Sequence, residues 1–432
     1  MVRIAIAVLL SLPAAALAQT IAPNPAPAAA TAAAPLSAEV AEAEAAIVKS
    51  EWKAAEAKLA PWLAAHPEDA RALFDSGYVA DAQNRLEDAA GFYRRAVEAN
   101  PQSFEAHVEL GLLLARQEKF SEARPELAAA TTLEPGEAGV ESKARAWRAL
   151  AQIDRADDPT KASEDLLEAL KLTPETTADT LLAAELADQA GQFDAAEAAY
   201  KRVLAKEPKS APANAGLAHL LIARKQFPEA EALLRTALEQ APDDPALTAQ
   251  LATVLAAQDK GEALPLIQKL HEAHPKDTAI TRMLAELLAE AGDYAASDRN
   301  YIALLTTNPE DADLLVAHGQ NLLHLLKYGE SFAAFDKATR VDAADADAWS
   351  GLAFAASKTA QPAIAIHALT VRSRYLPEGP STYFLWAISY DSLHQKAQAI
   401  SYYHHFLDSS AGKLPDQEWQ AKQRLLLLEG KK

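Results

Sequence analysis

Two pairs of histidines come nearest to a pattern that could bind a metal or activate water. A metallopeptidase helix places two histidines at a spacing of four, with a glutamate between them. In the stretch "HEAH" the spacing from His271 to His274 is three. His404 and His405 are adjacent, so they face different sides of a helix, and their aromatic neighbours favour packing. We therefore expect no metal site at either pair.

Other chemistry-bearing motifs are missing from the sequence. It contains no Gly-x-Ser-x-Gly elbow, phosphate-binding loop or dinucleotide fingerprint, and only 15 of its 432 residues are glycine. We expect no enzymatic activity and no cofactor. The 41 Lys and Arg against 60 Asp and Glu give a net charge of −19, which argues against a nucleic-acid-binding surface.

The N-terminal stretch "MVRIAIAVLLSLPAAALAQT" predicts a secretory signal peptide over residues 1–18. It has one Arg3, a short apolar run and a small-residue cleavage site at Ala18. The run is broken by Pro13 and is shorter than the ~20 residues that span a bilayer, so we expect no transmembrane span after cleavage. The chain has no cysteine, and hence no disulfides. We expect export to the periplasm or the exterior of a bacterial cell envelope.

Residues 19–35 are rich in Ala and Pro and predict a linker without an amphipathic face. A regular spacing follows it. Of the nine intervals between consecutive recurring positions, seven are 34 residues, and the positions are Pro67, Pro101, Pro135, Pro174, Pro208, Pro242, Pro275, Pro309, Ala343 and Pro377. The spacing predicts a repeat, which would explain how a chain of this length folds without one large core.

Each period reads as two amphipathic helices, because its apolar residues are three and four apart. The proline ends the second helix, since it has no N–H to continue the hydrogen bonding. We expect a small residue in the first helix to let the second approach closely. We expect four aromatic residues to fill the remaining space: Phe193, Tyr200, Phe227 and Phe335.

The residues inside each period resemble the tetratricopeptide repeat, whose signature has the same length. One unit carries Leu110, Gly111, Leu114, Ala123, Leu127, Ala130 and Pro135, and another carries Trp349, Leu352, Ala353, Ala365, Leu369 and Pro377. The resemblance implies an all-α fold, a right-handed α-solenoid of stacked antiparallel helix pairs. It covers residues 36–413 in about eleven units, and we expect one continuous array.

Residues 414–430 are interpreted as a C-terminal capping helix with Trp419 and Leu426 turned inward. The four consecutive leucines from 425 to 428 exceed what a narrow apolar stripe needs, so a partner-binding tail is the alternative.

The resemblance implies a protein–protein interaction scaffold that binds a partner peptide or helix in a concave groove lined by the first helices. The sequence does not identify the partner. The groove positions become apolar and aromatic in the C-terminal third, at Val316, Leu323, Phe354, Phe384 and Ile388, and Gln320 lies among them, where it could hydrogen-bond the backbone of a ligand. These side chains either anchor a partner or pack on one another. An enzyme or accessory subunit of an envelope polysaccharide or peptidoglycan machine is the alternative function.

Four arginines, Arg116, Arg145, Arg148 and Arg155, fall on neighbouring first helices in the same register. Guanidinium groups bind carboxylates and phosphates bidentately, so these residues could hold an anionic group of a partner. The alternative is neutralisation by nearby acids, which include Glu109 and Glu185.

Overall fold

The computed structural model describes residues 37–135 and 139–430. Over these ranges all of the regular structure is α-helical, with no strand, and the helices run from α2 to α24. This confirms the predicted all-α fold of stacked helix pairs. The predicted signal peptide and linker lie outside the described residues. The chain divides into two compact units, residues 1–250 and 251–432, which are described separately.

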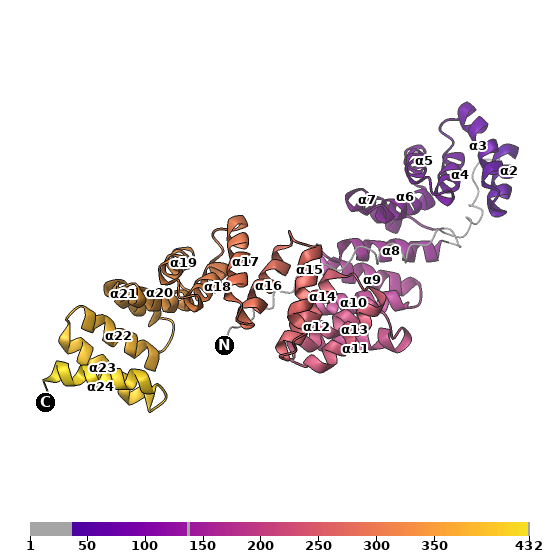
Figure 1. Cartoon of the computed structure of the whole chain (residues 1–432). Coiled ribbons are helices and arrows are strands. Elements are labelled where there is room, and N and C mark those ends of the chain that lie inside the picture. Colours follow the sequence, from indigo (N-terminus) through magenta and orange to yellow (C-terminus); the bar gives the residue numbers. More distant parts are fainter. Residues whose placement is uncertain (1–36, 136–138, 431–432) are drawn as a thin grey trace. The chain divides into compact units, whose positions relative to one another are not determined.

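In the first unit each helix packs against the next to form six hairpins (Figure 1). The helices are α2 (Ala38–Val48), α3 (Trp52–Ala65), α4 (Ala70–Ala82), α5 (Leu86–Ala99), α6 (Phe104–Arg116), α7 (Phe120–Thr132), α8 (Val140–Asp154), α9 (Pro159–Leu172), α10 (Thr177–Gln189), α11 (Phe193–Lys206), α12 (Ala211–Ala223) and α13 (Phe227–Gln240). The division between the units falls inside α14 (Pro245–Ala257).

The second unit continues the same alternation. Its helices are α15 (Ala263–Ala273), α16 (Thr278–Glu290), α17 (Tyr294–Thr307), α18 (Ala312–His324), α19 (Tyr328–Val341), α20 (Ala346–Lys358), α21 (Pro362–Arg372), α22 (Pro380–Ser392), α23 (Lys396–Ser410) and α24 (Pro415–Glu429). Helices α16 to α23 form four hairpins, and α24 packs on α23. The predicted bounds of the repeat array, 36–413, stay a prediction.

A left-handed residue lies in most of the hairpin turns, and it recurs with the repeat. The position has φ between 53° and 82° at Asn84, Glu118, Gly191, Lys225, Asp259, Gly292, Leu326, Ala360 and His394. This conformation reverses the chain within a few residues. The first helices then begin on side-chain caps; for example, the Asp69 carboxylate accepts from the backbone N–H of Arg71 and Ala72.

Glycines in the first helices lie against large side chains of the second helices. A Cβ on Gly77 would come within 2.6 Å of the Tyr93 ring in the same hairpin. A Cβ on Gly351 would come within 2.2 Å of Phe335, which belongs to the preceding hairpin. Close approach therefore matters both within hairpins and between them.

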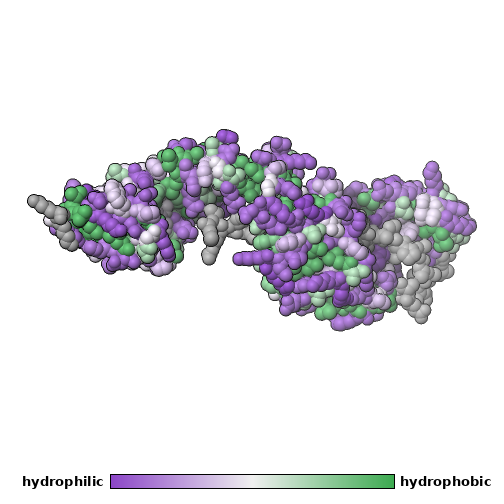
Figure 2. Space-filling view, turned by 60° about the horizontal axis from the view of Figure 1, so that its bottom comes forward, coloured by the Kyte–Doolittle hydropathy of each residue, from purple (hydrophilic) through white to green (hydrophobic). Residues whose placement is uncertain are grey.

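The expectation that Phe193 fills the core is wrong. Its side chain is 51% exposed at the start of α11, whereas Ala196, Tyr200 and Val203 of the same helix are buried. The buried stripe begins one turn later, so Phe193 falls outside it. Across the face shown in Figure 2, hydrophilic residues predominate and apolar residues form separate patches.

Candidate partner-binding site

The candidate binding residues lie on first helices that touch one another. Helix α6 contacts α8 in the first unit, and α18 contacts α20, which contacts α22, in the second. The first helices of successive hairpins thus form a row within each unit. Side chains on the free side of such a row share one surface.

In the second unit, α18 contributes one exposed and two half-buried candidates. Gln320 is exposed. Val316 and Leu323 are half-buried and pack against the core cluster that contains Phe335 and Leu352. The α18 surface therefore combines a free amide with apolar side chains that are not fully covered.

The aromatic candidates on α20 and α22 differ in their surroundings. Phe354 is half-buried, and the Lys358 ammonium lies 5.3 Å from its ring centroid. Phe384 packs on Phe406, with ring centroids 5.0 Å apart, and on Tyr403 at 6.4 Å. Ile388 is half-buried against the same cluster. Of the two alternatives left open above, Phe384 fits mutual packing within its hairpin, whereas Phe354 keeps more freedom to meet a partner.

In the first unit, each of the four candidate arginines pairs with an acid of a neighbouring first helix. Arg148 donates from Nε and Nη2 to both Asp179 oxygens at 2.9–3.1 Å, and Arg155 Nη1 lies 2.8 Å from Glu185 Oε2. Arg116 pairs with Asp81 at 2.5 Å, and Arg145 lies 3.9 Å from Glu109. The neutralisation alternative thus describes these side chains, and a partner's anion would have to displace the carboxylates.

The carboxylates in these pairs are mostly buried, which affects their protonation. Burial raises the pKa of Glu185, and the Arg155 guanidinium acts in the opposite direction. Burial also raises the pKa of the nearby Asp188 carboxyl, which His219 opposes. Burial therefore disfavours the charged form of Glu185, and the Arg155 guanidinium partly offsets this effect.

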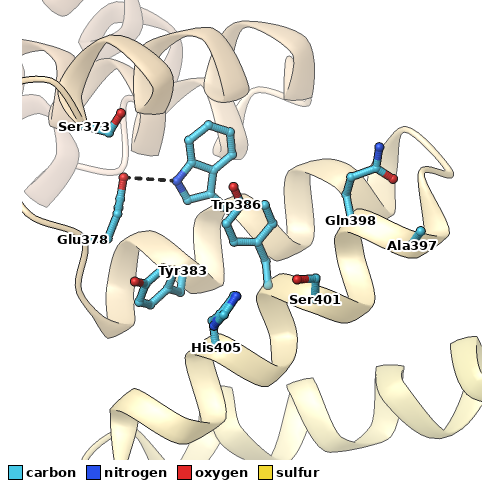
Figure 3. A pocket seen from close by; sticks show the side chains of 9 residues that line it. Ser373, Glu378, Tyr383, Trp386, Ala397, Gln398, Ser401 and His405 are labelled. Carbon is cyan, nitrogen blue, oxygen red and sulfur yellow. Dashed lines mark hydrogen bonds between the residues drawn. The ribbon is translucent and has the colours of Figure 1, made fainter.

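A pocket that the sequence did not reveal lies on the last hairpin (Figure 3). It is lined by residues of α22, of α23 and of the loop before α22, among them Glu378, Tyr383, Trp386, Tyr402 and His405. The stretches "STYFLWAISY" and "SYYHH" are rich in aromatic residues, and that density was the available signal. It could not show which rings would share a cavity.

The histidine pairs lie on or directly after the second helices α15 and α23, and His404 and His405 are both exposed. His271 lies in the last turn of α15 and His274 caps it. His404 Nε2 lies 2.8 Å from Glu429 Oε1, while His405 lines the pocket. Within residues 37–135 and 139–430, no group of three or more His, Asp or Glu is arranged to hold a metal ion.

Two family models match the chain, and both describe the tetratricopeptide repeat. One covers residues 40–104 and the other residues 187–253. Both segments coincide with helix pairs of the observed fold. The chain is a tetratricopeptide repeat protein. Repeats of this kind stack into extended surfaces that serve protein interaction.

The tetratricopeptide repeat protein is similar in part to much longer curated proteins. Cellulose synthase 1 operon protein C of Komagataeibacter xylinus is 28% identical over 197 residues, which cover 40% of this chain and 15% of that protein. Cellulose synthase operon protein C of Pseudomonas fluorescens strain SBW25 is 34% identical over 131 residues, covering 29% and 10%. The chain thus spans only 10–15% of the length of these two relatives.

Solved tetratricopeptide structures resemble parts of the chain. YrrB, described as a tetratricopeptide repeat protein with an unusual peptide-binding site, is 21% identical with a TM-score of 0.38; the match covers 43% of this chain and 96% of YrrB. Pseudomonas aeruginosa pilF is 19% identical with a TM-score of 0.43, and the match covers 49% and 97%.

The terminal helix of this tetratricopeptide repeat protein packs differently from the prediction. Trp419 is 64% exposed and Leu426 is 45% exposed, so the expectation that they turn inward is wrong. The buried residues are Ala421 and Leu425, one turn apart, with Leu428 half-buried beyond them. Arg424 fixes this face toward α23 and α22, because it donates to both oxygens of Asp391 at 2.7 and 2.8 Å.

Among the residues that the structure describes, no helix is both long enough and apolar enough to cross a bilayer.

Proposed function

We propose that the protein is an exported, non-enzymatic interaction scaffold of a bacterial cell envelope that binds a peptide or helix of a protein partner. The repeat fold supports the scaffold role, because stacked helix pairs present an extended surface and few convergent polar groups. The N-terminal stretch "MVRIAIAVLLSLPAAALAQT" supports export.

The proposed binding surface is the row of α18, α20 and α22. The observation that carries it is the contact of these three first helices, with exposed Gln320 one turn from half-buried Val316 on α18 and with half-buried Phe354 on α20. An amphipathic partner helix could cover the apolar side chains, while Gln320 hydrogen-bonds its polar edge. The half-buried side chains of Leu323, Phe384 and Ile388 form the base of the proposed surface.

Photo-crosslinking in intact cells tests this surface. We expect a photoreactive amino acid at Gln320 to form one dominant protein adduct, identified by mass spectrometry. The same group at Lys337, which is exposed on the second helix α19, is the matched control and should not form that adduct. Equal labelling from both positions would place the partner elsewhere.

Two single variants, Phe354→Ala and Phe384→Ala, separate binding from packing. A buried aromatic anchor can contribute ~2 kcal/mol or more, so we expect Phe354→Ala to lower capture per folded molecule at least tenfold. Phe384→Ala should instead lower the melting temperature, which is measured on the same samples, because Phe384 packs on Phe406. A sharp fall in melting temperature with unchanged capture in Phe354→Ala would assign Phe354 to the core as well.

A second candidate function is that of an accessory subunit of an envelope polysaccharide machine. The partial likeness to cellulose synthase operon proteins C favours it. On this proposal, deleting the gene should lower exported polysaccharide without changing the activity of the isolated synthesising enzyme. Unchanged polysaccharide export would count against it.

A further inference from the structure

The pocket on the last hairpin has the size of a small-molecule site. Its volume is about 640 Å³, which lies within the ~300–1,000 Å³ typical of such pockets. Its walls come from three segments: the loop that holds Glu378, one face of α22 with Tyr383 and Trp386, and one face of α23 with Gln398 and Ser401. In Figure 3 these side chains surround a common space.

The wall on the α22 side is a stack of aromatic rings. Trp386 lies parallel to Tyr402, with centroids 5.2 Å apart and planes within 9°, and Tyr390 adds a third nearly parallel ring. Tyr383 stacks on His405 at 5.5 Å. Trp386 is buried, while Tyr383 and Tyr402 are half-buried and line the pocket. The stack therefore fixes the rings and leaves part of their area open to a ligand.

The polar lining includes a carboxylate that is short of partners. Glu378 Oε1 accepts a long 3.4 Å hydrogen bond from Trp386 Nε1. Its Oε2 is buried, has no hydrogen-bond partner among the described residues, and lies 3.6 Å from Arg372 Nη1. Because Oε2 is closed to solvent and faces Arg372, a ligand donor would meet the Glu378 carboxylate at Oε1, where the bond from Trp386 is long and weak.

The other polar groups of the pocket can both donate and accept. Gln398, Ser401 and His405 are exposed on α23, and Ser373 lies across from them in the loop before α22. Neither Lys nor Arg lines the pocket, which disfavours an anionic ligand, and Arg372 already balances Glu378, which disfavours a cationic one. The ligand that fits is uncharged, rich in groups that both donate and accept, and flat on one face.

We propose that this pocket binds one or two rings of a neutral oligosaccharide. A pyranose ring presents C–H groups on its face, which pack on aromatic rings, and hydroxyls at its edge, which match the mixed donors and acceptors. Tyr383 and Tyr402 supply the aromatic surface, and the Glu378 carboxylate accepts a hydrogen bond from a sugar hydroxyl. The ligand class differs from that of the partner surface proposed above, although the pocket and that surface share helix α22.

Calorimetric titration of the purified full-length protein tests the proposal. The probes are three neutral glucose tetrasaccharides of different linkage: cellotetraose, laminaritetraose and maltotetraose. We expect at least one to bind, and Gln398→Ala or His405→Ala to weaken it about fivefold each, as loss of one hydrogen bond implies. Tyr383→Leu should weaken it about tenfold through loss of the ring.

His404→Ala is the matched control, because His404 adjoins His405 in sequence but contacts Glu429 instead of lining the pocket. Its affinity should equal that of the wild type. Far-ultraviolet circular dichroism confirms the fold of each variant. Failure of all three sugars to bind at millimolar concentration overturns the proposal, as does equal binding by the His405 and His404 variants.

A lysine-rich peptide is the competing probe. If it binds and Gln398→Ala abolishes that binding while the sugars do not bind, the pocket recognises a cationic side chain and the carbohydrate proposal is wrong. The Gln320 crosslink reports the protein partner independently of all these outcomes.

Discussion

At the scale of single residues, glycine in this protein has opposite roles within one hairpin. Gly77 in α4 faces the Tyr93 ring at a distance that excludes a Cβ, whereas a Cβ on Gly91 in α5 meets nothing within 4 Å. We expect Gly77→Ala to lower the free energy of unfolding by about 1–3 kcal/mol through overpacking. Gly91→Ala should raise it by about 0.5–1 kcal/mol through helix propensity.

Urea unfolding of the two glycine variants checks this pair. The comparison is matched because both changes add one methyl group to helices of the same hairpin. If both variants are destabilised to a similar extent, the close approach of the Tyr93 ring to Gly77 does not determine the effect.

Asp75 in α4 should make stability depend on pH. Burial raises the pKa of this carboxyl to about 8 from its ordinary 3.8; Glu44 and Asp69 add to the rise and Arg71 opposes it. Between about pH 4 and pH 8, the Asp75 carboxyl is therefore protonated in the folded state and ionised in the unfolded state. The free energy of unfolding therefore falls as pH rises through that window and levels off above it.

The variant Asp75→Asn cannot titrate, so its stability should lack this slope. We expect its advantage over the wild type to grow by about 1 kcal/mol per pH unit between pH 5 and 8, measured by urea unfolding. Glu68→Gln, at an exposed neighbouring acid, is the control. Parallel pH profiles for Asp75→Asn and the wild type would refute the raised pKa.

At the scale of elements, two leucines of α24 test which face of this helix packs against α23. Leu425 is 7% exposed and Leu427 is 72% exposed on the same helix. We expect Leu425→Ala to cost about 2–3 kcal/mol, because it leaves a cavity against α23. Leu427→Ala should stay within about 0.5 kcal/mol of the wild type. Thermal melting of the two variants measures the difference, and equal costs would mean that α24 is not docked on this face.

The helices themselves could be predicted because their pattern repeats. Proline spacing and apolar residues three and four apart predict two helices in each period, and the structure contains such pairs, for example α6 and α7. Orientation was harder to predict. Trp419 lies beside the packed stripe of α24, whereas Phe193 lies in line with the packed stripe of α11, one turn before its buried part. The pattern of apolar residues does not say which of them meet a neighbour.

Contacts between hairpins were the least predictable. Gly351 approaches Phe335 of the preceding hairpin, and Gly216 approaches Tyr200 in the same way. Gly351 lies eight residues after Ala343, and Gly216 lies eight residues after Pro208. Ala343 and Pro208 are two of the recurring positions, so the spacing in the sequence contained a signal for these contacts. The oligosaccharide pocket had no such signal, because it joins a loop to two helices whose separation only the folded hairpin sets.

At the scale of the molecule, the period of 34 residues predicts which deletions are tolerated. Removing residues 209–242 takes out α12 and α13 and leaves every remaining helix in alternation. We expect this variant to stay helical and to unfold cooperatively, but to be less stable than the wild type, because Tyr200 then faces Gln250 in place of Gly216. Removing residues 209–225 takes out α12 alone and sets two second helices in sequence, which should destabilise the fold by several kcal/mol.

Circular dichroism with thermal melting compares the two deletions. The shorter deletion is the control, since it removes half as many residues. If the 34-residue deletion is the more damaging of the two, the hairpin is not the unit of stacking.

The differing glycine and aromatic contacts have a consequence for biosynthesis. A chain of near-identical modules risks joining the wrong neighbours, or those of another copy, as it emerges. Here some junctions carry a match of their own: Tyr200 needs the space at Gly216, and Arg148 needs the Asp179 carboxylate. A wrong junction would set a ring against a Cβ or leave an acid buried without its cation. These matched contacts favour pairing of a hairpin with the hairpin that is synthesised next.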